Sequence, residues 1–229
     1  MNLYRILYES EPRREVKPSG PPPTGLRLLW ATLRREWWRL VKANILFWLC
    51  CLPLVTIPAA LKALSRVCIT LLRGESCDLW PDWWAAFRDG FLRTTGAGAL
   101  AALALFAVGS GVRFYGTAMA RNGLLAVPAL LLLVLELVLA LALAPLFLLL
   151  EFSELKLPDA LRSAVLLTLV RLPQNLMVLL VLGVMAAGYL LAYPYSSFVL
   201  GAIALSLFWL IACSVVWPGL EKYVFHTSE

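Results

Sequence analysis

The sequence predicts an all-α, polytopic transmembrane helical bundle. Hydrophobic residues make up 61% of the 229 positions and charged residues only 15%, which leaves too little polar surface for a water-soluble domain of this size. The mean hydropathy is +0.81. Long apolar stretches alternate with short polar or Pro- and Gly-containing ones, the pattern of successive membrane helices. The predicted apolar segments are 44–57, 58–72, 95–112, 126–150, 173–192 and 198–216.

The chain divides into a short polar segment and one membrane domain. Residues 1–25 are polar and end in a Pro- and Gly-rich run, from which we expect a flexible, poorly helical linker. Residues 26–229 are predicted to form a single membrane-embedded helical domain. No small-residue cleavage site follows the first apolar run, so we expect that run to remain in the protein.

Two prolines organise the first part of this domain. Pro53 and Pro58 interrupt the apolar run that begins at Asn44, well short of the ~20 residues that a membrane-spanning helix needs. Together with Thr56 they predict a turn. Two topologies are compatible with it: residues 44–72 cross the membrane once, or they enter, turn and return to the side that they left.

The distribution of Lys and Arg separates the two topologies. If residues 44–72 cross once, the basic residues divide 11 against 9, which is no bias. If the segment returns, 16 of the 20 lie on one side and two on the other, with the last two on the returning arm. The second arrangement follows the positive-inside rule. We therefore predict a Pro-broken N-terminal hairpin, four further spans and cytoplasmic N- and C-termini.

Two amphipathic segments combine tryptophan with arginine, a mixture typical of the lipid headgroup boundary. The first covers residues 26–43. The second begins near Pro81, where aromatic residues recur at helical spacing. Stacking on bases or sugars is an alternative for this aromatic stripe, but its surroundings favour anchoring in the membrane. We therefore predict lipid or partner contacts for Trp80, Trp83 and Trp84.

Basic residues occur in two further places beside apolar helices. Lys62 and Arg66 lie on one stripe of segment 58–72, as in a helix at the membrane interface or one that faces a bundle interior. Arg171 lies just before segment 173–192. We predict interfacial contacts with lipid or a partner for Lys62, Arg66 and Arg171. For Arg171 we expect an anionic lipid or an interfacial ion pair rather than a substrate.

Segment 95–112 is rich in glycine and alanine, which allows a neighbouring helix to approach closely. We assign Gly98 and Ala102 to this helix-packing surface, and we expect the surface to contact another membrane protein.

Glu136 is the sharpest candidate for a functional residue. It lies about midway along segment 126–150, where an ionisable group is costly and therefore indicates a function by default. No Asp, His or Lys is clearly placed at the same depth, so a proton relay lacks its second member. Two interpretations remain: a neutral structural carboxyl that hydrogen-bonds a neighbouring helix, which we favour, or a residue of a transport path.

The sequence contains no pattern for catalysis, a cofactor or a metal. The five cysteines have no CxxC spacing, and His226 is the only histidine. No GxSxG, HExxH or Walker A motif occurs. Basic residues are spread over segment ends instead of forming one patch, which argues against a nucleic-acid partner. We predict that the protein is not an enzyme and has no catalytic, cofactor-binding or metal-binding residue.

Three stretches of the chain resemble a known family. They are WRLVKANILFWLCCLPLVTIP at 38–58, LRGE at 72–75 and WWAAFRDGF at 83–91. They are similar to the YesL family, also called the domain of unknown function DUF624, whose pattern contains an L-P-[VI]-V-T-I-G-P-A turn before an aromatic helix. The glycine usual before the second proline is absent, because Ile57 directly precedes Pro58. The similarity extends towards the C-terminus and covers most of the chain.

The resemblance implies a multi-pass protein of the bacterial cytoplasmic membrane, of a kind often linked with carbohydrate uptake and without an established activity. We therefore predict a non-enzymatic accessory or scaffold component of oligosaccharide uptake. Its partners would be the lipid bilayer and another membrane protein, such as a sugar ABC transporter component, or a second copy of itself. The alternatives are a small transporter or permease-like protein for a sugar or an ion and, after it, a membrane enzyme.

Overall fold

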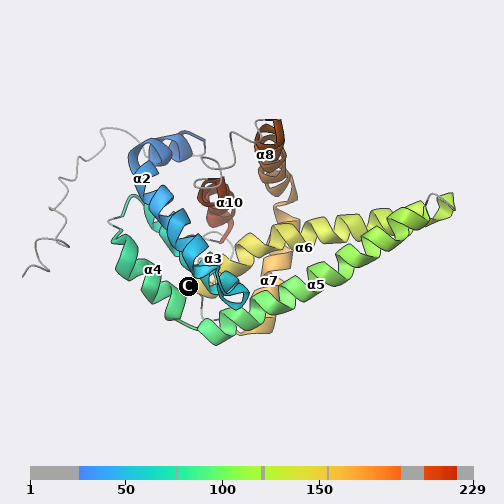
Figure 1. Cartoon of the computed structure of the whole chain (residues 1–229), viewed down its shortest axis with the longest axis horizontal. Coiled ribbons are helices and arrows are strands. Elements are labelled where there is room, and N and C mark those ends of the chain that lie inside the picture. The colour runs from blue at the N-terminus through green and yellow to red at the C-terminus, as the bar shows by residue number, and fades with distance from the viewer. Residues whose placement is uncertain (1–25, 76, 120–121, 154, 192–203, 221–229) are drawn as a thin grey trace, which may run out of the picture.

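The described part of the chain consists of α-helices joined by short connections and contains no strand, which confirms the all-α fold class. The computed structural model describes residues 26–75, 77–119, 122–153, 155–191 and 204–220. The predicted linker 1–25 and the beginning of segment 198–216 lie outside these ranges. The α-helices, seen in Figure 1, are α2 (Leu26–Cys50), α3 (Ile57–Arg73), α4 (Leu79–Arg88), α5 (Phe91–Ala118), α6 (Ala126–Phe152), α7 (Leu157–Val170), α8 (Leu172–Leu191) and α10 (Ala204–Leu220).

α2 and α3 form the predicted hairpin. They run antiparallel, because Arg35 near the start of α2 donates a hydrogen bond to the Leu71 carbonyl near the end of α3. The connection contains the short 3-10 helix η1 (Leu54–Thr56). A second 3-10 helix, η2 (Gly123–Leu125), precedes α6.

The residues of the turn explain why the chain reverses there. The Thr56 hydroxyl hydrogen-bonds the carbonyl oxygens of Cys50 and Pro53, which lie past the hydrogen-bond ladder of α2. Pro58 lies in the first turn of α3, where the missing N–H of proline leaves no intrahelical bond unmade. The two prolines and the threonine thus end one helix and begin the next.

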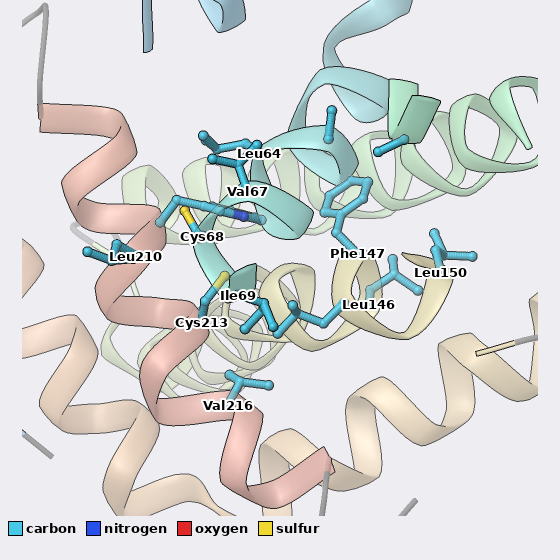
Figure 2. Packing of buried hydrophobic residues seen from close by; sticks show 14 of the residues in the cluster. Leu64, Val67, Cys68, Ile69, Leu146, Phe147, Leu150, Leu210, Cys213 and Val216 are labelled. Atoms are coloured by element: carbon cyan, nitrogen blue, oxygen red, sulfur yellow. The ribbon is translucent and has the colours of Figure 1, made fainter. Parts of the chain in front are cut away.

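α3 is the centre of the bundle. Ten of its 17 residues are buried, and it packs against α2, α4, α5, α6 and α10. Figure 2 shows Cys68 of α3 beside Cys213 of α10, with Phe147 of α6 in the same apolar cluster. A helix that is apolar on most sides is buried in protein or in lipid, and here the neighbouring helices cover it. α3 therefore lies in the bundle interior, one of the two settings that its sequence pattern allowed.

Two glycines set the path of α5 past α3. Gly90 joins α4 to α5 in the left-handed conformation, with a φ of +54°, which residues with a Cβ atom rarely adopt. Further along α5, Gly98 lies against Pro58 at the start of α3. A Cβ atom at Gly98 would lie 2.2 Å from Pro58 Cγ, so this close approach requires glycine.

α5 and α6 form a long antiparallel pair that projects from the bundle (Figure 1). Its outward faces expose large apolar side chains such as Phe106 and Leu131. The helical stretches Leu54–Arg73, Phe91–Ala118 and Gly123–Phe152 are long and apolar enough to cross a membrane, and Leu205–Leu220 is apolar but shorter. An apolar surface of this extent is typical of a protein that lies in lipid.

Two predicted boundaries are corrected by the structure. α2 is one helix with a kink at Glu36, so it contains both the amphipathic segment 26–43 and the beginning of the arm 44–57. α5 continues past the predicted end of segment 95–112 to Ala118. No proline interrupts that stretch, and just before it Gly109 and Gly111 face Glu136 and Leu132 of α6, whose packing offsets the low helix propensity of glycine.

Candidate functional site

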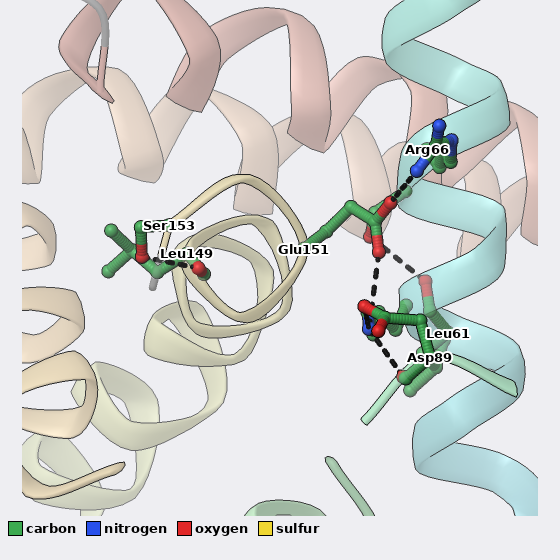
Figure 3. A network of polar contacts seen from close by, with 8 residues as sticks. Leu61, Arg66, Asp89, Leu149, Glu151 and Ser153 are labelled. Atoms are coloured by element: carbon green, nitrogen blue, oxygen red, sulfur yellow. Dashed lines mark hydrogen bonds and ion pairs between the residues drawn. The ribbon is translucent and has the colours of Figure 1, made fainter. Parts of the chain in front are cut away.

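Four charged side chains meet where α3, the α4–α5 junction and the end of α6 come together. Arg66 Nη1 donates a hydrogen bond to Glu151 Oε1 at 2.8 Å (Figure 3). One turn earlier on α3, Lys62 Nζ lies 3.4 Å from Glu151 Oε2 and 3.0 Å from Asp89 Oδ2. We call Lys62, Arg66, Asp89 and Glu151 the ion cluster.

The ion cluster is buried at its centre and open at its edges. The side chains of Lys62 and Glu151 are 2% and 1% exposed, whereas those of Arg66 and Asp89 are 44% and 76% exposed. An unpaired ammonium or carboxylate at the buried positions would cost several kcal/mol. Because two cations meet two anions, the buried pair is neutralised within the chain.

The backbone at the α4–α5 junction positions Asp89. Asp89 is extended and Gly90 is left-handed, and the Asp89 carbonyl oxygen accepts a hydrogen bond from Lys62 Nζ at 2.7 Å. Lys62 directs its hydrogen bonds to Asp89, while its contact with Glu151 Oε2 is ionic without hydrogen-bond geometry. Lys62 thus connects α3 to the α4–α5 junction through hydrogen bonds to two Asp89 oxygens, and to α6 through its ion pair with Glu151.

A further arginine holds the same corner of the bundle together. Arg93, in the first turn of α5, donates a hydrogen bond to the Leu155 carbonyl in the α6–α7 connection. Hydrogen bonds with an ionised donor are about twice as strong as neutral ones. The arrangement is therefore suited to holding α3, α5 and α6 in register. Within the described residues, no group of three or more His, Cys, Asp or Glu side chains could hold a metal ion.

The three basic residues for which contacts were predicted lie in different environments. Lys62 is buried, so its predicted contact with lipid is wrong and an internal ion pair takes its place. Arg66 pairs with Glu151 and keeps part of its side chain exposed. Arg171 packs against Gly219 and donates to the Val215 carbonyl of α10 at 2.9 Å, an internal contact between helices.

The three tryptophans of α4 also differ in their exposure. Trp83 is fully buried in the bundle core, so it does not contact lipid and the prediction for this residue is wrong. Trp80 and Trp84 are exposed and stack with ring centroids 6.2 Å apart. The Arg88 guanidinium lies 5.0 Å from the centre of the Trp84 ring. Only the exposed pair can lie at a lipid surface.

Gly98 and Ala102 do not share one environment. Gly98 is buried against Pro58 of the same chain, so its closely packed neighbour is internal. Ala102 is exposed on α5. Of the two, only Ala102 is therefore accessible to a second protein.

Glu136 lies apart from the ion cluster, on the projecting α5–α6 pair. It is half-buried and faces α5 at Gly109, where a Cβ atom would lie 2.9 Å from Glu136 Oε1. Among the described residues, none forms an ion pair with Glu136. The carboxyl thus occupies space that a glycine on the facing helix leaves open.

Sequence reasoning missed the two acidic members of the ion cluster. A signal was present, because Lys62 and Arg66 interrupt an otherwise apolar helix and buried cations require counter-charges. The carboxylates that supply them, Asp89 and Glu151, lie at the ends of neighbouring helices. A search for acidic residues at the ends of predicted apolar segments would have included both.

The α3–α4 connection buries one cysteine. Burial, with a smaller contribution from the charge of Asp82, raises the pKa of the Cys77 thiol to about 12. The thiol therefore stays protonated at neutral pH, and a protonated thiol is a poor nucleophile. Cys77 fits a packing role.

The comparisons with known proteins agree with the resemblance found in the sequence. A family model described as "Protein of unknown function, DUF624" matches residues 40–111 and confirms the resemblance to DUF624 for that part of the chain. The matched region runs from the middle of α2 into α5 and includes three of the four residues of the ion cluster. The chain matches no curated protein and no solved structure.

Proposed function

We propose that this chain, a membrane-type helical bundle with a DUF624 region, is a non-enzymatic accessory or scaffold component that binds another membrane protein in oligosaccharide uptake. The binding role is supported by the projecting α5–α6 pair. The link with carbohydrate is supported only by the resemblance of the sequence to the YesL family. The two parts of the proposal are therefore tested separately.

The observation that carries the binding role is the outward face of α5. It exposes small residues, Gly96, Ala99 and Ala102, beside the large Leu103 and Phe106. No atom lies within 4 Å of the place where a Gly96 Cβ would be. In lipid, helices associate by close packing, because burial of apolar area gives little advantage over contact with acyl chains. A face that is small and open suits a partner helix.

The ion cluster supports a scaffold rather than a path for substrate. Its buried members, Lys62 and Glu151, are engaged with each other and with Asp89 and Arg66. Groups that neutralise one another hold helices together and do not offer free charge to a passing sugar or ion. The bundle then serves as a rigid base from which α5 and α6 extend.

Co-purification with the membrane subunits of a sugar transporter tests the proposal. The variant Ala99→Leu with Ala102→Leu adds bulk to the outward face, and we expect it to reduce the recovered transporter subunits while membrane insertion stays normal. Ala140→Leu adds bulk to an exposed position of α6 and is the matched control. Equal recovery from both variants would contradict binding through α5. Absence of transporter subunits from the unaltered sample, with another membrane protein recovered, would contradict the carbohydrate link alone.

A small transporter is the second candidate, and Glu136 is the observation that favours it. This carboxyl lies within a helix of spanning length and has no ion-pair partner among the described residues. Such residues mark translocation paths in many membrane proteins. Purified protein in liposomes should then move a labelled oligosaccharide or a cation. Flux that depends on Glu136 would replace the accessory proposal.

A further inference from the structure

The N-terminal half of α2 carries an open pocket that the ion cluster and the α5–α6 pair do not use. The pocket has a volume of about 350 Å³ and is lined by Trp30, Leu33, Arg34 and Trp37. Its lining residues lie on both sides of the kink at Glu36. Beyond the kink, α2 continues into the bundle (Figure 1). Among the described residues, its lining combines two indole rings, one aliphatic side chain and one guanidinium.

The charge of this pocket is not neutralised within the described chain. The nearby carboxylate of Glu36 is 3% exposed and is engaged by Arg35 and Arg39 at 3.1 Å each. Among the described residues, no carboxylate pairs with Arg34, whose side chain is exposed. The kink therefore uses the acidic residue internally and leaves Arg34 available for an external anion.

The apolar part of the lining is also uncovered. Trp30 and Trp37 are 68% and 49% exposed. Tryptophan is enriched at the boundary between acyl chains and headgroups, where the ring contacts apolar atoms and the N–H remains near polar ones. The chain has helices of membrane-spanning length, so lipid is present around it in any functional state.

We propose that this pocket binds the headgroup of an anionic phospholipid. Arg34 donates to the lipid phosphate, for which a planar guanidinium has matching two-point geometry. Trp30, Leu33 and Trp37 cover the glycerol and the first acyl carbons. A free phosphate would satisfy the charge but leave the apolar lining exposed, which is why the pocket fits a lipid. The site lies outside the α5 face of the proposed function and does not depend on it.

Lipid titration of the purified full-length chain in detergent tests the proposal. Bound phosphatidylglycerol and phosphatidylcholine are counted by native mass spectrometry. We expect phosphatidylglycerol to bind more tightly, and Arg34→Gln to weaken its binding about fivefold, the effect of one cation near an anionic headgroup. Arg34→Lys keeps the charge without the two-point geometry and should lie between the two. Lys42→Gln, exposed on α2 outside the pocket, is the matched control and should leave binding unchanged.

Three results would overturn the proposal. Equal loss from Arg34→Gln and Lys42→Gln would mean diffuse attraction to the charge of α2. Equal affinity for the two lipids would contradict a site for anionic lipid, because both lipids carry a phosphate and differ in the net charge of the headgroup. Displacement of the lipid by millimolar inorganic phosphate would indicate an anion site without a lipid component. Melting curves of each variant in detergent exclude unfolding as the cause of a lost signal, and Trp30→Ala gives a second variant that weakens the apolar contact alone.

Discussion

Polar groups have different environments in the bundle around α3 and in the projecting α5–α6 pair. In the bundle, Lys62 and Glu151 are almost fully buried and are neutralised by each other and by Asp89 and Arg66. In the α5–α6 pair, the outward faces are apolar and Glu136 meets the glycine position 109 of the facing helix instead of an opposite charge.

This difference assigns different tasks to the two regions. Buried ion pairs are costly to break but need exact partners, so they select one arrangement of α3, α5 and α6. Close helix contacts at glycine require no particular polar group, because they depend on the absence of a side chain. Substitutions in the bundle should therefore act on folding, whereas those on the outward faces of α5 and α6 should act on contacts with lipid or a partner.

The largest effect is expected where the two regions join, at Gly98. Gly98→Ala places a Cβ atom 2.2 Å from Pro58 Cγ, and neither the proline ring nor the α5 backbone can easily move. We expect a loss of about 3 kcal/mol in the free energy of unfolding, at the upper end of the usual cost of overpacking. Thermal melting in detergent, monitored by circular dichroism, measures it.

Gly96→Ala is the matched control for this substitution. It lies two residues away on α5, and no atom lies within 4 Å of its missing Cβ. Alanine is the better helix former, so we expect a gain of about 0.5–1 kcal/mol. Equal melting temperatures for the two variants would mean that α5 does not rest on Pro58 as described.

The next effect is expected in the ion cluster. Glu151→Gln leaves Lys62 buried with Asp89 as its remaining ion-pair partner among the described residues, and it removes the ionic acceptor of Arg66. Breaking a fully buried pair costs about 3–5 kcal/mol. We expect a loss below this range, about 2 kcal/mol, because Arg66 is 44% exposed and Lys62 keeps its contact with Asp89. The same melting experiment applies.

Asp89→Asn separates burial from charge in this cluster. Its side chain is exposed, and its carbonyl still accepts the hydrogen bond from Lys62 Nζ. We expect a clearly smaller loss than in Glu151→Gln. A larger loss would show that the exposed edge, not the buried centre, holds the bundle together.

The helical fold and the hairpin turn could be predicted because their signals are local. Proline removes an N–H wherever it stands, and threonine bonds nearby carbonyls, so Pro53, Thr56 and Pro58 indicate a turn without knowledge of the rest of the chain. The apolar segments that became α5 and α6 were equally visible, since their composition alone requires a lipid or protein environment.

The environment of individual side chains could not be read in the same way. A basic stripe on an apolar helix has the same sequence pattern at a membrane interface and inside a bundle. The environment of Lys62 is determined by its contact with Asp89, which lies 27 residues further along the chain. Trp83 and Trp84 are adjacent in the sequence, yet only tertiary packing determines that Trp83 is the buried one. Contacts over long sequence distances carry this information, and local spacing does not.

A smaller effect is expected within the α5–α6 pair, at Gly109. The nearest atom to a new Cβ is Glu136 Oε1, the far end of a flexible side chain, so the neighbour can move. We expect Gly109→Leu to cost about 1–2 kcal/mol and Gly109→Ala close to nothing, because its helix propensity offsets the contact. Combining Gly109→Leu with Glu136→Ala should restore most of the loss. Failure of this rescue in melting experiments would place the Glu136 side chain elsewhere.

The smallest effect on stability is expected for Glu136→Gln, and this variant also separates a structural carboxyl from a transport residue. Glutamine keeps the size of the side chain and its capacity to donate and accept hydrogen bonds, so the fit against Gly109 is preserved. We expect a change within about 0.5 kcal/mol, as for substitutions that remove no buried contact.

A residue that binds a cation or carries protons would behave otherwise, because the exchange removes the ionisable group however well the helices pack. The measurement pairs detergent melting with growth on an oligosaccharide whose uptake depends on the protein. Unchanged growth and melting are the expected outcome for the accessory role. Loss of growth at an unchanged melting temperature would instead indicate that α5 and α6 line a translocation path. The bundle, whose buried charges neutralise one another, would then be the support of that path.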